Sequence, residues 1–366
     1  MRIVHTEASC GWGGQEIRIL EESKGMIERG HEVLLLCPPE SGIHTEAVRW
    51  GVAVEALPIG RKKLQGVLAL RHWLQTHRID ILNTHSSTDS WLTALACASL
   101  SQSPPLVRTR HISAPIPDNG PTRWLYTRAT HHIVTTGEAL RRELIERNRY
   151  PASMITSVPT GIDPARFYAG DKPRVRQLLG LDTDGHYLGI VATLRSWKGH
   201  LYLLDAFSRI EAPDWKLLIV GDGPMREALQ KRADELGMQG RAIFVGQQTE
   251  PEKWLRALDI FCLPSYANEG VPQALIQAMM TELPIVTTPV GAIGELISDG
   301  STGLIVTPKS AEALATAISK LMRDTATAAA LGQRARAAAV ASYSREAMLD
   351  HMTRIFESVL AGSQTA

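Results

Sequence analysis

A glutamate in the C-terminal half stands directly before a predicted helix. It belongs to the segment 268–272 (Asn-Glu-Gly-Val-Pro), which follows an apolar run at 260–264. Pro272 suits the first position of a helix, so we predict that the helix begins there and that its free N–H groups can bind a diphosphate. Glu269 lies at a strand's carboxyl end, where ligands of open α/β sheets bind. Gln277 could hold a second part of the same ligand. The alternative is that Glu269 only complements the helix dipole and Gln277 is solvated.

Two cations and two glycines follow other predicted strands of the same half. Arg195 and Lys198 come just after the apolar run at 187–193, while Gly221 and Gly246 end two further runs. Positive side chains at a strand end could clamp phosphates and neutralise a leaving group. The alternative is that the two cations are ordinary surface charges in an exposed turn and that the two glycines only form turns.

The N-terminal half has a glycine loop and two histidines in comparable positions. Gly13 and Gly14 follow the apolar run at 2–6, where glycine lets the backbone turn sharply and approach a ligand. The spacing is not the G-x-G-x-x-G of dinucleotide sites, and a plain tight turn explains it too. His111 ends the run LVRTR, where it could bond a ligand or shuttle a proton. By position alone, a histidine such as His111 is more often structural than catalytic, and His85 is a similar but weaker candidate.

Composition excludes several classes of protein. The 366 residues carry a formal net charge of +1, which argues against a nucleic-acid partner. The four cysteines form no C-x-x-C pair, which argues against a zinc or redox motif, and Cys37 and Cys262 within apolar runs fit a reducing compartment. The first residues show no signal-peptide hydrophobic region, so we expect a cytoplasmic location. The sequence contains no stretch of about 18 or more apolar residues, so we expect no membrane span. No histidine or carboxylate cluster suggests a metal, and we expect no cofactor.

Thirteen short apolar runs alternate with stretches of helical character. Such alternation predicts an α/β fold with parallel sheets, and the number of runs favours two sheets over one. The runs are 2–6, 33–37, 54–57, 81–85, 106–110, 131–136, 155–160, 187–193, 216–221, 242–246, 260–264, 284–288 and 303–308.

Turn-rich sequence near 161–186 suggests where the chain divides. We predict an N-terminal domain at 1–166, a C-terminal domain at 167–344 and a separate amphipathic helix within 345–366. In the first long helical stretch, Ile17, Leu20 and Ile27 mark the face expected to be buried.

Together these motifs resemble the retaining glycosyltransferases of family 4, which have the GT-B fold. The resemblance covers nearly the whole chain, and it rests on the order and spacing of its parts. They are the loop 13–16, DILNTHS (80–86), His111, PTGID (159–163), WKG (197–199), VGDGP (220–224), and the segments 259–279 and 291–306.

The resemblance implies two Rossmann-like domains that face each other across a cleft, with the nucleotide-sugar held by the C-terminal domain and no metal. It implies that the last helix packs back on the N-terminal domain. Glu269 and His111 would be the catalytic residues. The implied donor-binding residues are Gly13, Gly14, Arg195, Lys198, Gly221, Gly246, Gly270, Val271, Pro272 and Gln277.

Two positions depart from the family pattern. Gln277 stands where a second glutamate usually bonds the ribose; an amide still bonds a hydroxyl but loses the charge-assisted bond. Thr193 stands where an arginine is common, and Arg195 could substitute for it.

Our hypothesis is transfer of a hexose from a nucleotide diphosphate sugar, with UDP as the expected nucleotide, to a glycan or lipid-linked glycan of the lipopolysaccharide type. The alternatives are a nucleotide-sugar epimerase on the same fold and a sugar-nucleotide-binding protein without catalysis. Arg61, Lys62 and Lys63 precede apolar Leu64 and Leu68, and the stretch 123–149 is rich in arginine. Such segments can lie on the inner face of an anionic membrane, although solvated helix faces explain them as well.

Overall fold

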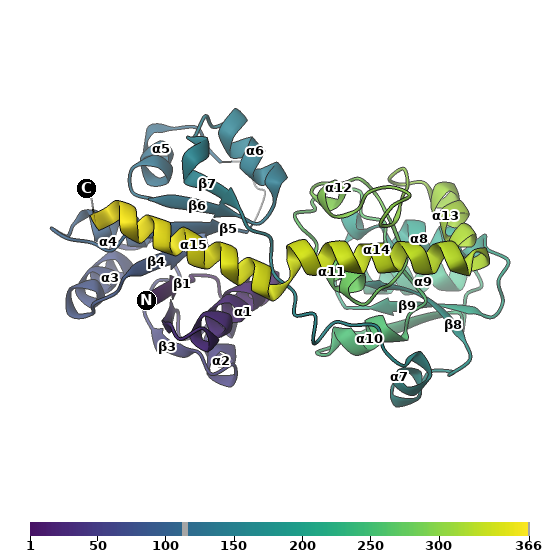
Figure 1. Ribbon diagram of the computed structural model, residues 1–366. Helices are drawn as coiled ribbons and strands as arrows, with labels where there is room; N and C mark the ends of the chain where they lie inside the picture. Colours follow the sequence, from purple (N-terminus) through teal and green to yellow (C-terminus); the bar gives the residue numbers. More distant parts are fainter. Residues whose placement is uncertain (112–115, 365–366) are drawn as a thin grey trace. The chain divides into compact units, whose positions relative to one another are not determined.

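The computed structural model describes residues 1–111 and 116–364 (Figure 1). It contains two compact units, one formed by Met1–Gly161 with Arg345–Ala366 and the other by Ile162–Ser344. The boundary that we predicted after residue 166 therefore lies a few residues beyond the division after Gly161. Residues 365 and 366 of the predicted terminal helix lie outside the described residues.

The first unit is built on a parallel sheet of seven strands in the order β3-β2-β1-β4-β5-β6-β7. The order reverses between β1 and β4, which makes the carboxyl ends of these two strands the switch point of the sheet. The strands are β1 (Arg2–Thr6), β2 (Glu32–Cys37), β3 (Ala53–Ala56), β4 (Ile81–Thr84), β5 (Leu106–Arg110), β6 (His132–Thr135) and β7 (Ile155–Ser157).

Helices cover both faces of this sheet, as its mostly buried strands require. The predicted terminal helix is present, and it buries Met348, Met352 and Phe356 against Ile3 and Met26. Figure 1 shows it in yellow along the first unit. The helices are α1 (Gly14–Glu28), α2 (Gly42–Arg49), α3 (Leu64–Thr76), α4 (Ser87–Ala98), α5 (Gly120–Thr127), α6 (Glu138–Glu146), the 3-10 helix η1 (Ala152–Met154) and α15 (Arg345–Gln364).

The buried face of α1 is only partly the one that the apolar pattern predicted, since Leu20 is buried and Ile17 is half-buried. Ile27 is exposed, whereas Arg18 and Glu22 are fully buried together with Ile19. The Arg18 guanidinium donates to the Val158 carbonyl at 2.6 Å. Hydrogen bonds with Val158 and Asn83, together with the Arg18–Glu22 ion pair at 3.7 Å, offset part of the cost of burying this polar side of α1.

The second unit is built on a parallel sheet of six strands in the order β10-β9-β8-β11-β12-β13, whose switch point lies between β8 and β11. All thirteen predicted runs thus form strands, and the prediction of two parallel sheets is confirmed. The strands are β8 (His186–Val191), β9 (Trp215–Val220), β10 (Ala242–Gly246), β11 (Ile260–Leu263), β12 (Ile285–Thr287) and β13 (Leu304–Ile305).

One large apolar cluster joins this sheet to its helices. The helices are α7 (Lys172–Leu178), η2 (Ser196–Lys198), α8 (His200–Ser208), α9 (Arg226–Glu235), α10 (Pro251–Ala257), α11 (Gln273–Met280), α12 (Ile293–Leu296), α13 (Ala311–Arg323) and α14 (Thr325–Tyr343). Across the described residues of both units, no helix is long and apolar enough to cross a membrane.

Candidate functional site

Lys198 and Glu269 form an ion pair at the switch point of the second unit. The ammonium group of Lys198, at the end of η2, lies 2.7 and 2.9 Å from the two carboxylate oxygens of Glu269. Glu269 follows β11 and is only 7% exposed. The hydroxyl of buried Ser265 donates to the same carboxylate, and the carbonyl of Ser265 accepts a bond from the Thr288 hydroxyl. The carboxylate is therefore held from two sides.

Two glycines let the loops of this site approach one another. Gly291 has φ +60°, and a Cβ there would overlap the carbonyl oxygen of Glu269. Gly199 has φ +79°, and a Cβ there would overlap the carbonyl oxygen of Pro264. Both positions need glycine because the backbone is left-handed and another main chain lies in contact with it. They fix the loops that carry Lys198 and Glu269.

The other predicted donor-binding residues of this unit lie at the same edge of the sheet. The N–H of Gly221 donates to the carbonyl of Gly246 at 2.9 Å, so the ends of β9 and β10 are joined. Arg195 is exposed, with its guanidinium 5.7 Å from the ring centre of Trp197.

The start of α11 differs from the prediction. Pro272, with φ −73° and ψ 113°, is the N-cap of α11, and the first helical residue is Gln273. Proline's fixed φ suits an extended N-cap as well as a first turn, which explains the shift by one residue. Gly270 is exposed and Val271 packs partly on the core. Gln277 is partly buried within α11.

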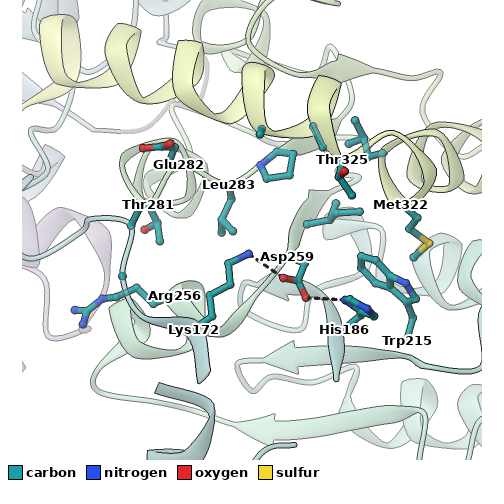
Figure 2. A pocket seen from close by; sticks show the side chains of 17 residues that line it. Lys172, His186, Trp215, Arg256, Asp259, Thr281, Glu282, Leu283, Met322 and Thr325 are labelled. Atoms are coloured by element: carbon teal, nitrogen blue, oxygen red, sulfur yellow. Dashed lines mark hydrogen bonds and ion pairs between the residues drawn. The ribbon is translucent and has the colours of Figure 1, made fainter. Parts of the chain in front are cut away.

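A cavity of about 510 Å³ lies at the opposite edge of this sheet, at the amino ends of its strands. Figure 2 shows Lys172, Asp259 and His186 in its wall, near Trp215. Asp259 pairs with Lys172 at 2.8 Å and with Arg176 at 2.7 Å. Asp259 is thus engaged by two cations, and none of the predicted site residues lines the cavity. It is therefore separate from the candidate site.

In the first unit, a buried carboxyl group supports the glycine loop. Gly13 is the N-cap of α1 and Gly14 its first residue. Glu7, just after β1, accepts bonds from the Ser9 N–H at 2.6 Å and from the side chain of Gln15. Burial, and then the nearby Asp89 carboxylate, raise the pKa of Glu7 to about 8. The loop is thus anchored by a buried carboxyl group.

His111 lies at the end of a row of three histidines. Its Nε2 is 2.9 Å from Nδ1 of His85, whose Nε2 is 2.8 Å from Nδ1 of His5. Burial is the main cause that lowers the pKa of each ring, and the charge of Arg18 lowers all three further. The rings are therefore neutral at pH 7. The backbone N–H of His85 donates to Asp89 at 2.8 Å, which fixes the start of α4.

Sequence reasoning missed four residues that support the candidate site. Asp89 could have been found, because Ser86 and Asp89 have the spacing of a capping box. Ser265, Glu7 and His5 gave no comparable signal, because their contacts depend on how the strands are ordered. No group of three His, Cys, Asp or Glu side chains suited to a metal occurs within the described ranges 1–111 and 116–364.

Family models match both halves of the chain. The model described as Glycosyltransferase Family 4 matches residues 12–166, and the one described as Glycosyl transferases group 1 matches residues 171–338. The chain is 31% identical to the lipopolysaccharide core biosynthesis mannosyltransferase LpsB of Rhizobium meliloti, over 56% of this chain and 61% of LpsB, which is less than two thirds of that relative. It is 26% identical to a D-inositol 3-phosphate glycosyltransferase of Mycobacterium marinum, over 92% of this chain and 79% of that protein.

Two solved structures share the fold of this chain over nearly its whole length. Anabaena HepE in complex with UDP superposes with a TM-score of 0.84 at 22% identity, covering 98% of this chain and all of HepE. A glycosyltransferase from Rickettsia africae superposes with a TM-score of 0.88 at 19% identity, covering 98% of each chain. At these identities the likeness establishes the GT-B fold. The two family matches together span most of the chain, and the fold and the sequence motifs agree with them. The chain therefore belongs to the family 4, group 1 glycosyltransferases.

Proposed function

We propose that this protein is a retaining glycosyltransferase that moves a hexose from a UDP-sugar to an acceptor hydroxyl. The observation that carries the proposal is the Lys198–Glu269 pair at the switch point of the second sheet. Ligands of open α/β sheets bind at such points. Structures of HepE contain UDP-glucose, or UDP together with glucose, which supports a UDP-sugar here.

Binding of the donor would redistribute the contacts of this pair. The diphosphate would attract Lys198 away from Glu269, and the carboxylate would then accept hydrogen bonds from the sugar ring. Lys198, with help from Arg195 and the amide groups at the start of α11, would stabilise charge on the departing phosphate. Glu269 would orient the ring for attack on the same face.

The remaining predicted residues would complete the donor site. Gln277 would bond the ribose, and His111 would lie near the reacting sugar. The loops with backbone groups near the donor would be those at Gly13, Gly14, Gly221, Gly246, Gly270, Val271 and Pro272. No metal takes part in this proposal.

The function is tested by incubating the protein with labelled UDP-, GDP- and ADP-sugars, with and without glycan acceptors. A transferase consumes the donor and labels the acceptor. Epimerisation without acceptor would support the epimerase instead, and an intact donor that still raises the unfolding temperature would indicate a binding protein. We expect acceptor-dependent transfer from a UDP-sugar and stabilisation by UDP.

We propose that the acceptor is a lipid-linked or lipopolysaccharide-type glycan and that α3 contacts an anionic membrane. Leu64 and Leu68, one turn apart at the start of α3, are 71% and 55% exposed, and they follow three cations, Arg61, Lys62 and Lys63. Exposed leucines beside cations suit the interface of an anionic bilayer. Within the other basic stretch, Arg141 and Arg147 pair with Glu138 and Glu143, which leaves less charge for lipid.

Replacing both Leu64 and Leu68 by glutamine should weaken binding to vesicles that contain anionic phosphatidylglycerol. The variant loses the apolar area that the bilayer would bury, but it keeps its three cations. Co-sedimentation with vesicles measures the bound fraction. Leu178→Gln is the matched control, because Leu178 is 73% exposed at the end of α7. Equal binding by the double variant and the control would contradict a contact through α3.

A further inference from the structure

Three imidazole rings of the first unit are joined end to end by two N···N contacts. They come from three neighbouring strand ends: His5 lies in β1, His85 follows β4 and His111 follows β5. Each contact joins Nδ1 of one ring to Nε2 of the next, at 2.8 Å and 2.9 Å. Both lengths are those of hydrogen bonds, so each contact needs one proton between its nitrogens.

We infer that these three rings, the histidine row, share one tautomer, and that His5 and His85 are positioning residues that fix the tautomer and orientation of His111. A neutral imidazole carries a single N–H, so its two nitrogens have opposite roles. If His85 carries its proton on Nδ1, then His5 must donate from Nδ1 and His111 must carry its own proton on Nδ1. If His85 carries it on Nε2, all three rings carry it on Nε2. A mixed row leaves two lone pairs or two protons face to face.

The surroundings of the row keep it neutral. Nε2 of His5 is buried and has no hydrogen-bond partner among the described residues. A proton that arrived at His111 therefore has no acceptor at the far end, so the row holds a ring in place and does not carry protons away. The charged groups around it are Arg18, which opposes protonation of each ring, and Glu22, which accepts from Asn83, the β4 neighbour of His5. Asp89 bonds the backbone of His85.

The shared tautomer gives His111 one fixed hydrogen-bonding role toward the substrate, either as donor or as acceptor. This step rests on the proposed function, in which His111 lies near the reacting sugar. Its Nδ1 is either a permanent donor or a permanent acceptor. Reversing it requires the two shared protons to cross their contacts, the outer proton to leave Nδ1 of His111, and a proton to reach Nε2 of His5, which is buried and has no partner among the described residues. Fixing the ring in this way removes rotational freedom before substrate binds.

Nitrogen-15 NMR of histidine-labelled protein at pH 7 tests the inference, because protonated and bare ring nitrogens have distinct shifts. We expect His5, His85 and His111 to show the same tautomer. His85→Phe should leave His111 as an average of two tautomers. His132→Phe is the control: His132 is half-buried in β6, its Nε2 contacts Thr156, and its loss should leave the row unchanged. Different tautomers among the three wild-type rings would overturn the inference, even if His85→Phe does not fold.

Kinetics provide the second readout. His85→Phe should lower kcat about 10- to 100-fold, as for loss of the outer partner of a metal-bound histidine, and leave the KM for the donor close to wild type. Unchanged kcat would refute the positioning role. The NMR measurement needs no substrate. One shared tautomer in a protein without transferase activity would overturn the proposed function alone, whereas mixed tautomers in an active transferase would overturn the histidine row alone.

Discussion

Replacing Glu269 by glutamine is expected to lower kcat for sugar transfer about a hundredfold or more while the protein stays folded. The amide keeps the shape of the side chain but loses the charge that binds Lys198 and the second strong acceptor for sugar hydroxyls. A donor sugar shifted by about 1 Å from its reacting position costs a factor of this size. Steady-state kinetics with saturating donor give the change in kcat.

Glu252→Gln is the matched control for that variant. Glu252 lies in α10 and is 8% exposed, close to the 7% of Glu269. Its carboxylate pairs with the guanidinium of Arg166 at 3.0 Å. Both substitutions remove a mostly buried carboxylate from an ion pair, so they should affect thermal unfolding similarly. Only Glu269→Gln should impair turnover. Wild-type kcat in Glu269→Gln, or equal losses in both variants, would contradict the role that we propose for Glu269.

Replacing Lys198 by alanine is expected to lower kcat/KM for the donor about 100- to 1,000-fold, the range found when one group that stabilises developing negative charge is removed. Lys198 is the cation that the structure places against Glu269, and the proposed mechanism transfers it to the diphosphate. Kinetics with varied donor concentration measure the loss, and titration with UDP measures the part due to ground-state binding.

The chain offers a close control for Lys198 at the opposite edge of the same sheet. Lys172 also pairs with a carboxylate, Asp259, at 2.8 Å, but it lies in the wall of the cavity at the amino ends of the strands. Lys172→Ala should leave kcat/KM within about twofold of wild type, as expected for a surface ion pair of small net effect. A comparable loss in both variants would show that the effect of Lys198 comes from general destabilisation.

The fold was largely predictable because its strands are continuous apolar runs. Runs such as KLLIVG have no polar face, so only a sheet covered on both sides can bury them. The buried face of α1 was not predictable in this way. Arg18 and Glu22 look like surface residues until Val158 and Asn83, far along the chain, provide their partners.

The site was predictable in its residue types and less so in its contacts. Glu269 and Lys198 were selected because each follows a strand, but their contact depends on β8 and β11 being neighbours, which the sequence does not display. His5 was missed for the same reason. A histidine in the middle of an apolar run reads as a core residue, and its meeting with His85 follows from the pairing of β1 with β4.

The return of α15 to the first unit has a consequence for how the chain folds during synthesis. Residues 1–161 leave the ribosome first, yet the layer that contains Ile3 and Met26 stays uncovered until Leu349 and Phe356 emerge almost 200 residues later. The continuous stretch 162–344 meets no such delay. Since domains generally fold as units on the ribosome, we expect the second unit to close its interior before the first, the reverse of the order in which the two are translated.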